Sequence, residues 1–523
     1  MILPASQVSA KVFDYIVIGK RRGLVVATRL SEDPSVSVLV IEAGPANLDD
    51  PEILNPARFA NRFGNPQYDW AFQTVPQNHC KNRALPFPRG KCLGGSSSLN
   101  FFQYHRPAKS DIDAFEELGN PGWNWELLGR YYTKSEHFIE PVENREVMAT
   151  DCAHHGPLVV GYPRMMSGFE LPFQMAMKNL GINLAAHPFS GNTKGAWFTP
   201  MTIDPIEGVR SYAANNYYQP NATRDNLHVV VCAQVTKIVT KPDLESRILT
   251  AVEVAFVCEG VCHSVKVGKE VILSAGQTSG TRMFGLPPTC MAFVPLASIT
   301  PAQETIHTSL AKSINDDIFA KKIPPSLAKQ YAIQLRHQRD REPSCEFVLW
   351  PLFKPILDMP LPGKQYICVA TYINHPFSRG SIHIVSSNPL VPPNIDPKYF
   401  ECEYDLLQLV EQIKFCRKIL NQEPMQRFLT GNEIRPGAQV QADSEIADFL
   451  RSDMSSTWHT VGSCSMLPLA DGGVVDRTLK VYNTTNIRIV DISVIPLHIG
   501  AHTQATAYAL GELGADIIKG NIF

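Results

Sequence analysis

The N-terminal part of the chain has the pattern of a strand, a tight turn, a helix and a second strand. Residues 13–18 are an apolar run that ends at Gly19, residues 23–30 continue as a helix, and residues 36–41 are a second apolar run that ends at Glu42. Such a unit places two parallel strands side by side and binds a dinucleotide at the turn. An acidic residue after the second strand binds the ribose hydroxyls of adenosine and disfavours a 2′-phosphate. The pattern predicts an α/β fold with a Rossmann-like lobe.

The turn itself departs from the usual dinucleotide-binding sequence. It reads Gly19-Lys-Arg-Arg-Gly23, so the middle one of the three expected glycines is replaced and the loop is one residue shorter. The middle glycine normally lets the backbone approach the pyrophosphate. Two interpretations stay open. Either Lys20, Arg21 and Arg22 neutralise the pyrophosphate from the side, or the site holds a dinucleotide only weakly.

Two histidines near the C-terminus lie on either side of an apolar run. His459 belongs to the small-residue segment 455–466, and His502 opens a helix expected over residues 503–518. The apolar run between them, residues 487–495, is typical of a strand. Imidazole titrates near neutral pH, so two imidazoles in one pocket can move protons to and from a hydroxyl group.

The histidine segments resemble the ending of the glucose-methanol-choline (GMC) family of flavoenzymes, in which Trp-His is followed by Gly-x-Cys-x-Met. Trp458, His459 and residues 462–466 match that signature. The resemblance extends from Asp14 to Gly520, and the segments that carry it are residues 68–76, 88–100, 119–125, 486–496 and 502–518. It implies that His459 is the base that takes the alcohol proton, and that His502 holds the substrate oxygen.

The same resemblance implies FAD as the cofactor and a GMC-type flavoprotein fold, with a Rossmann-like FAD lobe and an antiparallel-sheet substrate lobe. The implied FAD lobe takes residues 11–135, 205–285 and 446–523, with a mixed segment at 136–204 and the substrate lobe at 286–445. The implied cofactor contacts are Gly19, Gly23, Glu42, Ser96, Asn100, Phe101, Val235, Asp491, Thr503 and Gln504. For Phe101 two roles stay open: contact with the flavin or substrate, and ordinary core packing.

A second departure from the family pattern follows Gly276. Members of the family have a helix there and then an element that covers the flavin, whereas this chain passes almost at once to the apolar run at residues 291–296. The altered glycine turn and the short segment affect the same site. Together they predict that FAD binds more weakly than in an intact family member.

The remaining pattern predicts a substrate lobe and no metal site. Strands are expected at residues 346–350, 365–371 and 380–385, and a helix with one apolar stripe at residues 405–420. Cys258 and Cys262, next to His263, lie between strand-like runs, so we expect a hairpin turn there rather than a zinc site. The single histidines, expected to be structural or exposed, are His105, His375 and His383.

Composition narrows the class of partner. The formal net charge is −2 over 523 residues, without the basic excess that nucleic acid or an anionic membrane attracts. The N-terminus lacks the pattern of a secretory signal, so a cytoplasmic address is expected, with the 12 scattered cysteines reduced. We expect a small-molecule substrate, and the oligomeric state is left open.

Two functions compete. The resemblance implies FAD-dependent oxidation of an aryl or polyketide-like alcohol in fungal secondary metabolism. The alternative keeps the histidine pair without the redox step, because a paired acid and base suffice for the chemistry of a dehydratase, lyase, cyclase or isomerase. A catalytically inactive binding protein ranks last, since it gives no reason for the well-formed histidine region.

Overall fold

The predicted strand, turn, helix and strand are present at the N-terminus. The computed structural model describes the whole chain except residues 20, 141–154, 165, 275–283, 286–287 and 354–362. Strand β1 (Val12–Ile18) leads into helix α2 (Arg21–Leu30) and then into strand β2 (Val38–Ile41). The two strands pair in parallel, with Tyr15 opposite Val38 and Ile18 opposite Ile41. Their carboxyl ends therefore meet at one edge of the sheet, where Gly19 and Glu42 follow.

The main sheet extends this unit with segments from distant parts of the chain. Its strand order is β10-β2-β1-β13-β12-β11, and β21 also pairs with β13. The added strands are β10 (Leu227–Val230), β11 (Ala233–Pro242), β12 (Leu249–Cys258), β13 (Val261–Leu273) and β21 (Ile487–Ile489). β13 pairs in parallel with β1 and β21 and antiparallel with β12, so one long strand joins the Rossmann-like core to an antiparallel extension. Cys258 pairs with Val261, which confirms the predicted hairpin.

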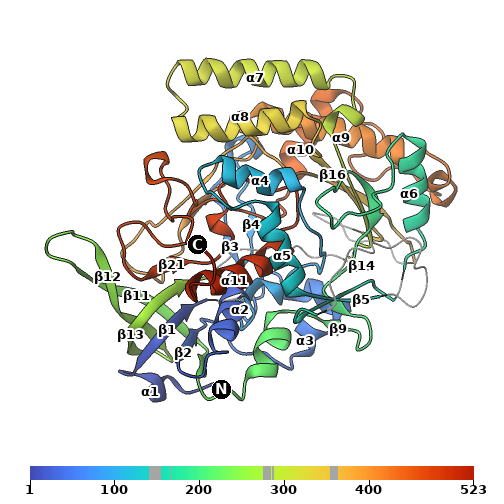
Figure 1. Ribbon diagram of the computed structural model, residues 1–523. Helices are drawn as coiled ribbons and strands as arrows, with labels where there is room; N and C mark the ends of the chain where they lie inside the picture. Colours follow the sequence, from blue (N-terminus) through green and yellow to red (C-terminus); the bar gives the residue numbers. More distant parts are fainter. Residues whose placement is uncertain (20, 141–154, 165, 275–283, 286–287, 354–362) are drawn as a thin grey trace.

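A layer of helices buries one face of this sheet. Helix α11 (Gln504–Ile518) contacts α2 and α5 (Trp125–Ser135), and α2 packs on β1 and β2 (Figure 1). α11 is buried along nearly all its length, as expected for a helix whose sequence is mostly Ala, Leu, Gly and Ile. Its start carries His502, Thr503 and Gln504. The buried packing of α11 fixes where these side chains lie.

The substrate lobe contains the predicted antiparallel sheet. Strands β15 (Cys290–Val294), β16 (Cys345–Trp350) and β18 (Cys368–Ile373) pair antiparallel with β16 in the centre. Helix α9 (Glu403–Leu420) packs against β16 and β18 and buries Leu406, Leu409 and Val410, which confirms the apolar stripe. Two helices that the sequence reading did not predict, α7 (Gln303–Phe319) and α8 (Pro325–Arg339), form a hairpin at the top of Figure 1.

Two predicted strands are shorter than expected. The run 487–495 is a strand only as far as Ile489, because the Asp491 side chain accepts the Ser493 N–H and turns the backbone into the short 3-10 segment η10 (Ile492–Val494). The run 380–385 contributes only β19 (Ser381–His383), which pairs with β20 (Asn394–Asp396).

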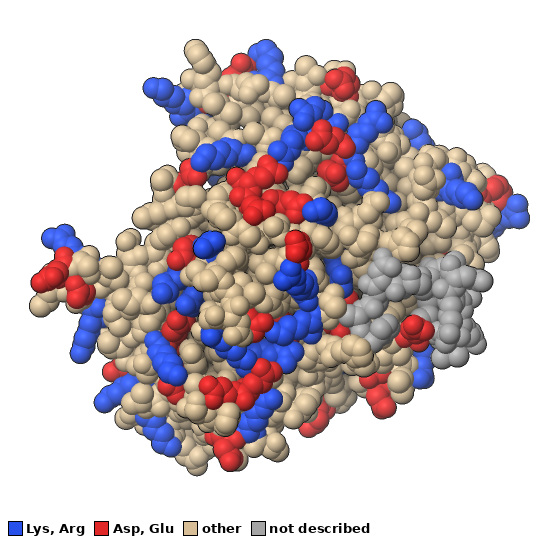
Figure 2. Space-filling model, in the orientation of Figure 1, with Lys and Arg blue, Asp and Glu red and all other residues tan. Residues whose placement is uncertain are grey.

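The other elements are short or peripheral. The helices are α1 (Ala5–Val8), α3 (Pro51–Leu54), α4 (Lys109–Glu117), α6 (Glu170–Asn179) and α10 (Asp443–Asp453). The strands are β3 (Phe72–Gln73), β4 (Pro86–Phe87), β5 (Glu136–Ile139), β6 (Leu158–Gly161), β7 (Gly195–Phe198), β8 (Ile203–Asp204), β9 (Val209–Arg210), β14 (Phe284–Gly285) and β17 (Leu352–Phe353). None of the helices described is both long and apolar enough to cross a bilayer. Acidic and basic side chains are interspersed over the face shown in Figure 2.

Candidate cofactor and active site

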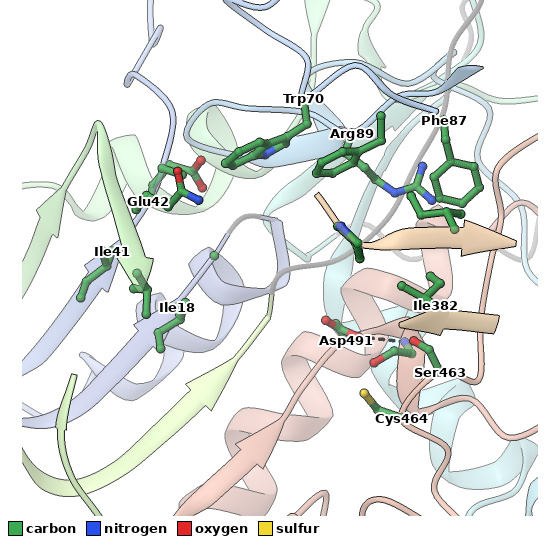
Figure 3. A pocket seen from close by; sticks show the side chains of 18 of the residues that line it. Ile18, Ile41, Glu42, Trp70, Phe87, Arg89, Ile382, Ser463, Cys464 and Asp491 are labelled. Atoms are coloured by element: carbon green, nitrogen blue, oxygen red, sulfur yellow. Dashed lines mark hydrogen bonds between the residues drawn. The ribbon is translucent and has the colours of Figure 1, made fainter. Parts of the chain in front are cut away.

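A pocket of about 440 Å³ opens at the carboxyl ends of β1 and β2, and four of the predicted cofactor residues line it (Figure 3). They are Gly19, Glu42, Val235 and Asp491. Glu42 is fully buried, and its Oε1 accepts the Gly44 N–H at 2.8 Å. This is the edge at which a Rossmann-like sheet binds a nucleotide. The structure therefore joins residues from the beginning, the middle and the end of the sequence in one nucleotide-sized cavity.

The glycines of the altered turn have separate roles. Gly19 has a φ of 99°, in the left-handed region that favours glycine, and it lines the pocket. Gly23 does not line it; a Cβ there would lie 2.9 Å from Val17 Cγ1, so glycine allows α2 to pack closely on β1. Lys20 lies outside the described residues, and Arg22 is buried without lining the pocket. That the basic turn neutralises a pyrophosphate stays a prediction.

An aromatic wall that the sequence reading did not assign to the site closes the pocket on its far side. Trp70 and Phe72 stack with ring centroids 5.7 Å apart, and the Arg89 guanidinium lies 4.0 Å from the Phe87 ring centroid. Burial lowers the pKa of Arg89 to about 9. The sequence did contain a signal for this wall, because residues 68–76 and 88–100 carry the family resemblance. From this region, however, the resemblance implied cofactor contacts only for Ser96, Asn100 and the adjoining Phe101.

A buried hydrogen-bond network joins predicted cofactor residues that lie far apart in the sequence. Asn100 Nδ2 donates to Gln504 Oε1 at 2.6 Å, and Gln504 Nε2 donates to Thr202 Oγ1 at 2.8 Å. Arg210 donates to Asn100 Oδ1 at 2.7 Å, and burial lowers the pKa of this arginine well below its ordinary value. The network fixes the start of α11 against the segment that follows the Gly94-Gly95 turn. Thr503 Oγ1, beside it, is buried and has no hydrogen-bond partner among the described residues.

Ser96 and Phe101, the other two predicted cofactor contacts, have mainly protein neighbours. Ser96 Oγ accepts the Gly90 N–H at 3.0 Å and so closes the turn formed by η3 (Gly95–Ser97). Phe101 is half-buried and packs edge-on against Phe59 and Trp350, with centroids 5.5 and 5.6 Å away. The packing role left open for Phe101 is therefore present, and its contact with a flavin stays a prediction.

The two predicted catalytic histidines meet. The ring centroids of His459 and His502 are 4.8 Å apart, and both side chains are half-buried. Trp458, which precedes His459, has a φ of 58°, unusual for a bulky residue, and its indole N–H donates to Pro86 O at 2.5 Å. His498 Nε2 lies 2.8 Å from the His459 carbonyl oxygen. Backbone strain of this kind persists only where the surroundings hold it, and it is frequent at active sites.

Two further side chains hold His502, and the sequence reading missed both. Glu346 on β16 is buried, and its Oε1 lies 2.7 Å from His502 Nε2. His105, expected to be without a partner, instead accepts the His502 backbone N–H at its Nε2 at 3.1 Å. Burial, and then the nearby His502, lower the pKa of His105 well below its ordinary value, so His105 is neutral and able to accept. A carboxylate within an otherwise apolar strand was the available signal for Glu346, because a buried charge requires a partner.

The arrangement brings together two imidazoles whose nitrogens are able to exchange protons. His459 carries an imidazole that can take a proton, and His502 is oriented from three sides by Glu346, His105 and α11. A third histidine expected to be isolated, His375, also has a partner, since its Nε2 lies 2.7 Å from Asp111 Oδ1. That pair lies against Gly500, two residues before His502, and is considered below.

Comparison with known proteins identifies the family. The family model described as GMC oxidoreductase matches residues 16–284 with its N-terminal part and residues 376–511 with its C-terminal part. The GMC oxidoreductase family protein Mala s 12 of Malassezia sympodialis is 30% identical, over 98% of this chain and 93% of the relative. The glucose oxidase-like protein fsoC of Humicola fuscoatra is 32% identical over 97% and 95%. Versicolorin B synthase of Aspergillus parasiticus is 28% identical over 97% and 88%.

These alignments span 581, 568 and 577 positions, more than the 523 residues of the chain, so each relative has residues without a counterpart here. The short segment expected after Gly276 falls outside the described residues. A solved structure, the FAD-dependent oxidoreductase from Chaetomium thermophilum, matches with a TM-score of 0.84 and 24% identity over 97% of this chain and 99% of that chain. This likeness confirms the predicted GMC-type flavoprotein fold. The chain belongs to the GMC oxidoreductase family.

Proposed function

We propose that this protein oxidises an alcohol with FAD, and that His459 and His502 carry the proton chemistry. The observation that carries the proposal is the approach of the two imidazoles to 4.8 Å, with Glu346 fixing one of them. Aromatic side chains gather beside the pair: the Tyr372 ring lies 6.4 Å from that of His502, and its hydroxyl lies 3.3 Å from Trp350 Nε1. This environment supports an aryl or polyketide-like substrate, and the fungal relatives support a role in secondary metabolism.

The residues present fit FAD. Glu42 and Val235 line the pocket at the strand ends and would hold the adenosine, and Asp491, which also lines it, would contact the phosphates or the ribityl chain. The buried Thr503 Oγ1 lacks a partner at the start of α11, which is consistent with a polar ligand group there. When bound, FAD supplies the two-electron acceptor for the alcohol carbon.

The side chains of the chain itself supply the rest of the mechanism. His459, in its neutral form, takes the hydroxyl proton of the alcohol. His502 holds the substrate oxygen, and Glu346 and His105 keep its ring and backbone in place. The first turn of α11 leaves backbone N–H groups free and carries a partial positive charge, which favours negative charge near Thr503 and Gln504.

Flavin content and product analysis test this function together. Because the middle glycine is replaced, we expect purified protein to hold less than one FAD per chain, and added FAD to raise that content. With FAD present, loss of an aryl alcohol should accompany hydrogen peroxide formation or dye reduction. Tight, stoichiometric flavin without added FAD would show that the basic turn compensates. Alcohol turnover that releases no reducing equivalents would contradict the proposal.

One observation favours a second candidate, non-redox acid–base chemistry. A relative that matches 97% of this chain is named a synthase rather than an oxidase or dehydrogenase. The histidine pair suffices for dehydration or cyclisation without a hydride acceptor. This candidate predicts conversion of substrate with neither peroxide nor reduced dye, and no dependence on added FAD.

Substitution of Glu42 by glutamine tests the adenosine site. Glu42 is buried and accepts the Gly44 N–H, so alanine would also leave a backbone donor unsatisfied, whereas glutamine keeps an acceptor of the same length. Loss of a charge-assisted hydrogen bond to ribose weakens binding by about 1.5–3 kcal/mol. We expect Glu42→Gln to raise the Kd for FAD about ten- to hundredfold in calorimetry. Glu259→Gln, at an exposed hairpin tip, is the control. An unchanged Kd would place the adenosine elsewhere.

A further inference from the structure

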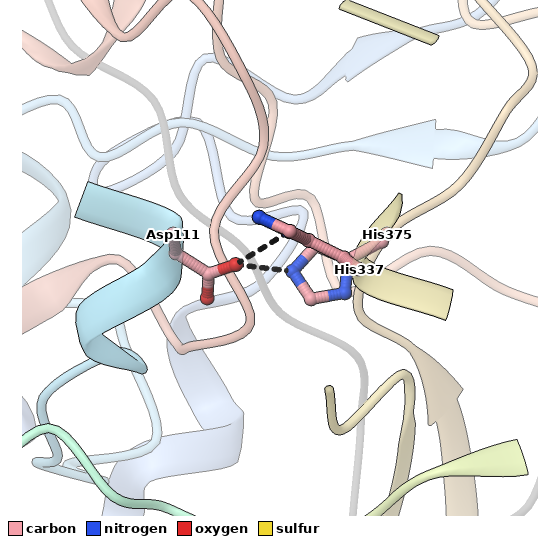
Figure 4. A group of neighbouring side chains, drawn as sticks. All are labelled: Asp111, His337 and His375. Atoms are coloured by element: carbon pink, nitrogen blue, oxygen red, sulfur yellow. Dashed lines mark hydrogen bonds and ion pairs between the residues drawn. The ribbon is translucent and has the colours of Figure 1, made fainter. Parts of the chain in front are cut away.

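Three buried side chains from separate elements meet around one carboxylate (Figure 4). Asp111 lies on α4, His337 on α8 and His375 in the segment after β18, and each is at most 4% exposed. Asp111 Oδ1 lies 2.7 Å from His375 Nε2 and 3.8 Å from His337 Nδ1. One ligand atom from each residue lies within 4.8 Å of the other two. In Figure 4 both imidazoles approach the same carboxylate oxygen.

His337 makes this cluster unusual. Its Nδ1 is buried and has no hydrogen-bond partner among the described residues, while the oxygen that it approaches already pairs with His375. Such a buried, unsatisfied polar atom destabilises a fold, because it loses its hydrogen bonds to water and gains none. Apolar side chains of the same two helices, α4 and α8, among them Ala114 and Ile333, belong to one buried cluster. A ligand shared by the three side chains would satisfy the nitrogen.

We propose that Asp111, His337 and His375 bind one divalent transition-metal ion, with zinc as the preferred ion. An ion about 2.0–2.2 Å from each of the three atoms would hold them at most about 4.4 Å apart, and they lie within 4.8 Å of one another, so small shifts of the side chains suffice. Two imidazoles and one carboxylate are ligands that zinc and its neighbours accept. The burial of all three ligands indicates a structural site rather than a catalytic one.

The position of the site gives the ion a role for the active site. The second carboxylate oxygen of Asp111 accepts the Gly500 N–H at 2.7 Å, two residues before His502. A Cβ at Gly500 would lie 3.1 Å from Asp111 Oδ2 and 3.2 Å from His375 Cε1, so glycine permits this close approach. The ion would thus tie α4, α8 and the His375 segment to one another directly beneath the catalytic loop. It is not part of the nucleotide pocket, and it does not depend on the proposed redox chemistry.

Metal analysis of tag-free protein tests the site. After incubation with zinc and removal of the excess, we expect about one equivalent of zinc per chain, and a melting temperature above that of chelator-treated protein. Cobalt in place of zinc should give visible absorption bands. In His337→Leu, both the bound metal and the zinc-dependent rise in melting temperature should be lost. His383→Leu, the same change at an exposed histidine on β19, should keep both.

His337→Leu also distinguishes a metal site from a metal-free His375–Asp111 pair. Without a metal site, the variant removes a buried nitrogen that has no hydrogen-bond partner among the described residues, so after the same zinc treatment it should melt at or above the temperature of the wild type. That result, or wild-type protein with less than a tenth of an equivalent of zinc and no response to added zinc, would overturn the proposal. Zinc retained at one equivalent by His337→Leu would also overturn it, because the ion would then lie elsewhere. The test does not use His375→Leu, because that variant would also leave Asp111 without its hydrogen-bond partner.

Discussion

In the variant His459→Asn, turnover of the alcohol should fall about 10²–10⁴-fold, the usual contribution of general acid–base catalysis. Asparagine keeps polar atoms of similar reach but cannot take a proton at neutral pH. The His459 side chain is only half-buried, and its backbone carbonyl accepts a hydrogen bond from His498 that survives the substitution. The melting temperature should therefore stay close to that of the wild type. Steady-state turnover, measured with saturating FAD, and a thermal melt check the two halves of this prediction.

The control for His459→Asn is His383→Asn, at an exposed histidine with no link to the pair. It should keep both turnover and melting temperature. If His459→Asn keeps full turnover and melts much earlier, the imidazole is structural and the base has to be sought elsewhere. Substrate loss and reducing equivalents should be followed together, because the substitution abolishes both in an oxidase but only the first in a non-redox enzyme.

The order of apolar and turn residues along the chain predicted those strands and helices whose signals lie close together in the sequence. Residues 13–42 were interpretable because an apolar run, a glycine turn and a helix follow in the order that a parallel pair requires, and β1, α2 and β2 form there. The hairpin at Cys258 was predictable for the same reason. Helices α7 and α8 were not recognised; their faces carry few buried apolar residues, such as Leu310 and Ile314, so the helical period is weak.

The sequence does not predict which side chains from distant elements contact one another. The family resemblance supplied His459 and His502, but Glu346 is 156 positions away from His502, and nothing in its strand indicates which imidazole it meets. Spacing along the chain indicates no partner for His105 or His375, because their partners come from other elements. Burial of a polar side chain is the feature these residues share, and burial depends on tertiary packing.

The second large effect is expected at the His502–Glu346 pair, where one substitution should lower both turnover and melting temperature. Glu346 is 2% exposed and its side chain is paired with His502 at 2.7 Å, so His502→Asn takes the imidazole partner from a buried carboxylate. Breaking a buried pair by removing one member destabilises a protein by about 3–5 kcal/mol. We expect His502→Asn, unlike His459→Asn, to lose both turnover and melting temperature.

A double variant shows whether the loss of turnover and the loss of stability have the same cause. Glutamine at position 346 keeps the shape of glutamate without its charge, so His502→Asn combined with Glu346→Gln should recover most of the melting temperature while turnover stays low. Recovery would reflect removal of the buried carboxylate that lost its hydrogen-bond partner, since replacing both members of a buried pair costs less stability than removing one of them. The measurement is a double-mutant cycle of melting temperature and turnover over the four proteins. Additive changes in stability would show that Glu346 does not depend on His502. Turnover that returns with stability would show that His502 acts only through folding, and that His459 alone carries the proton.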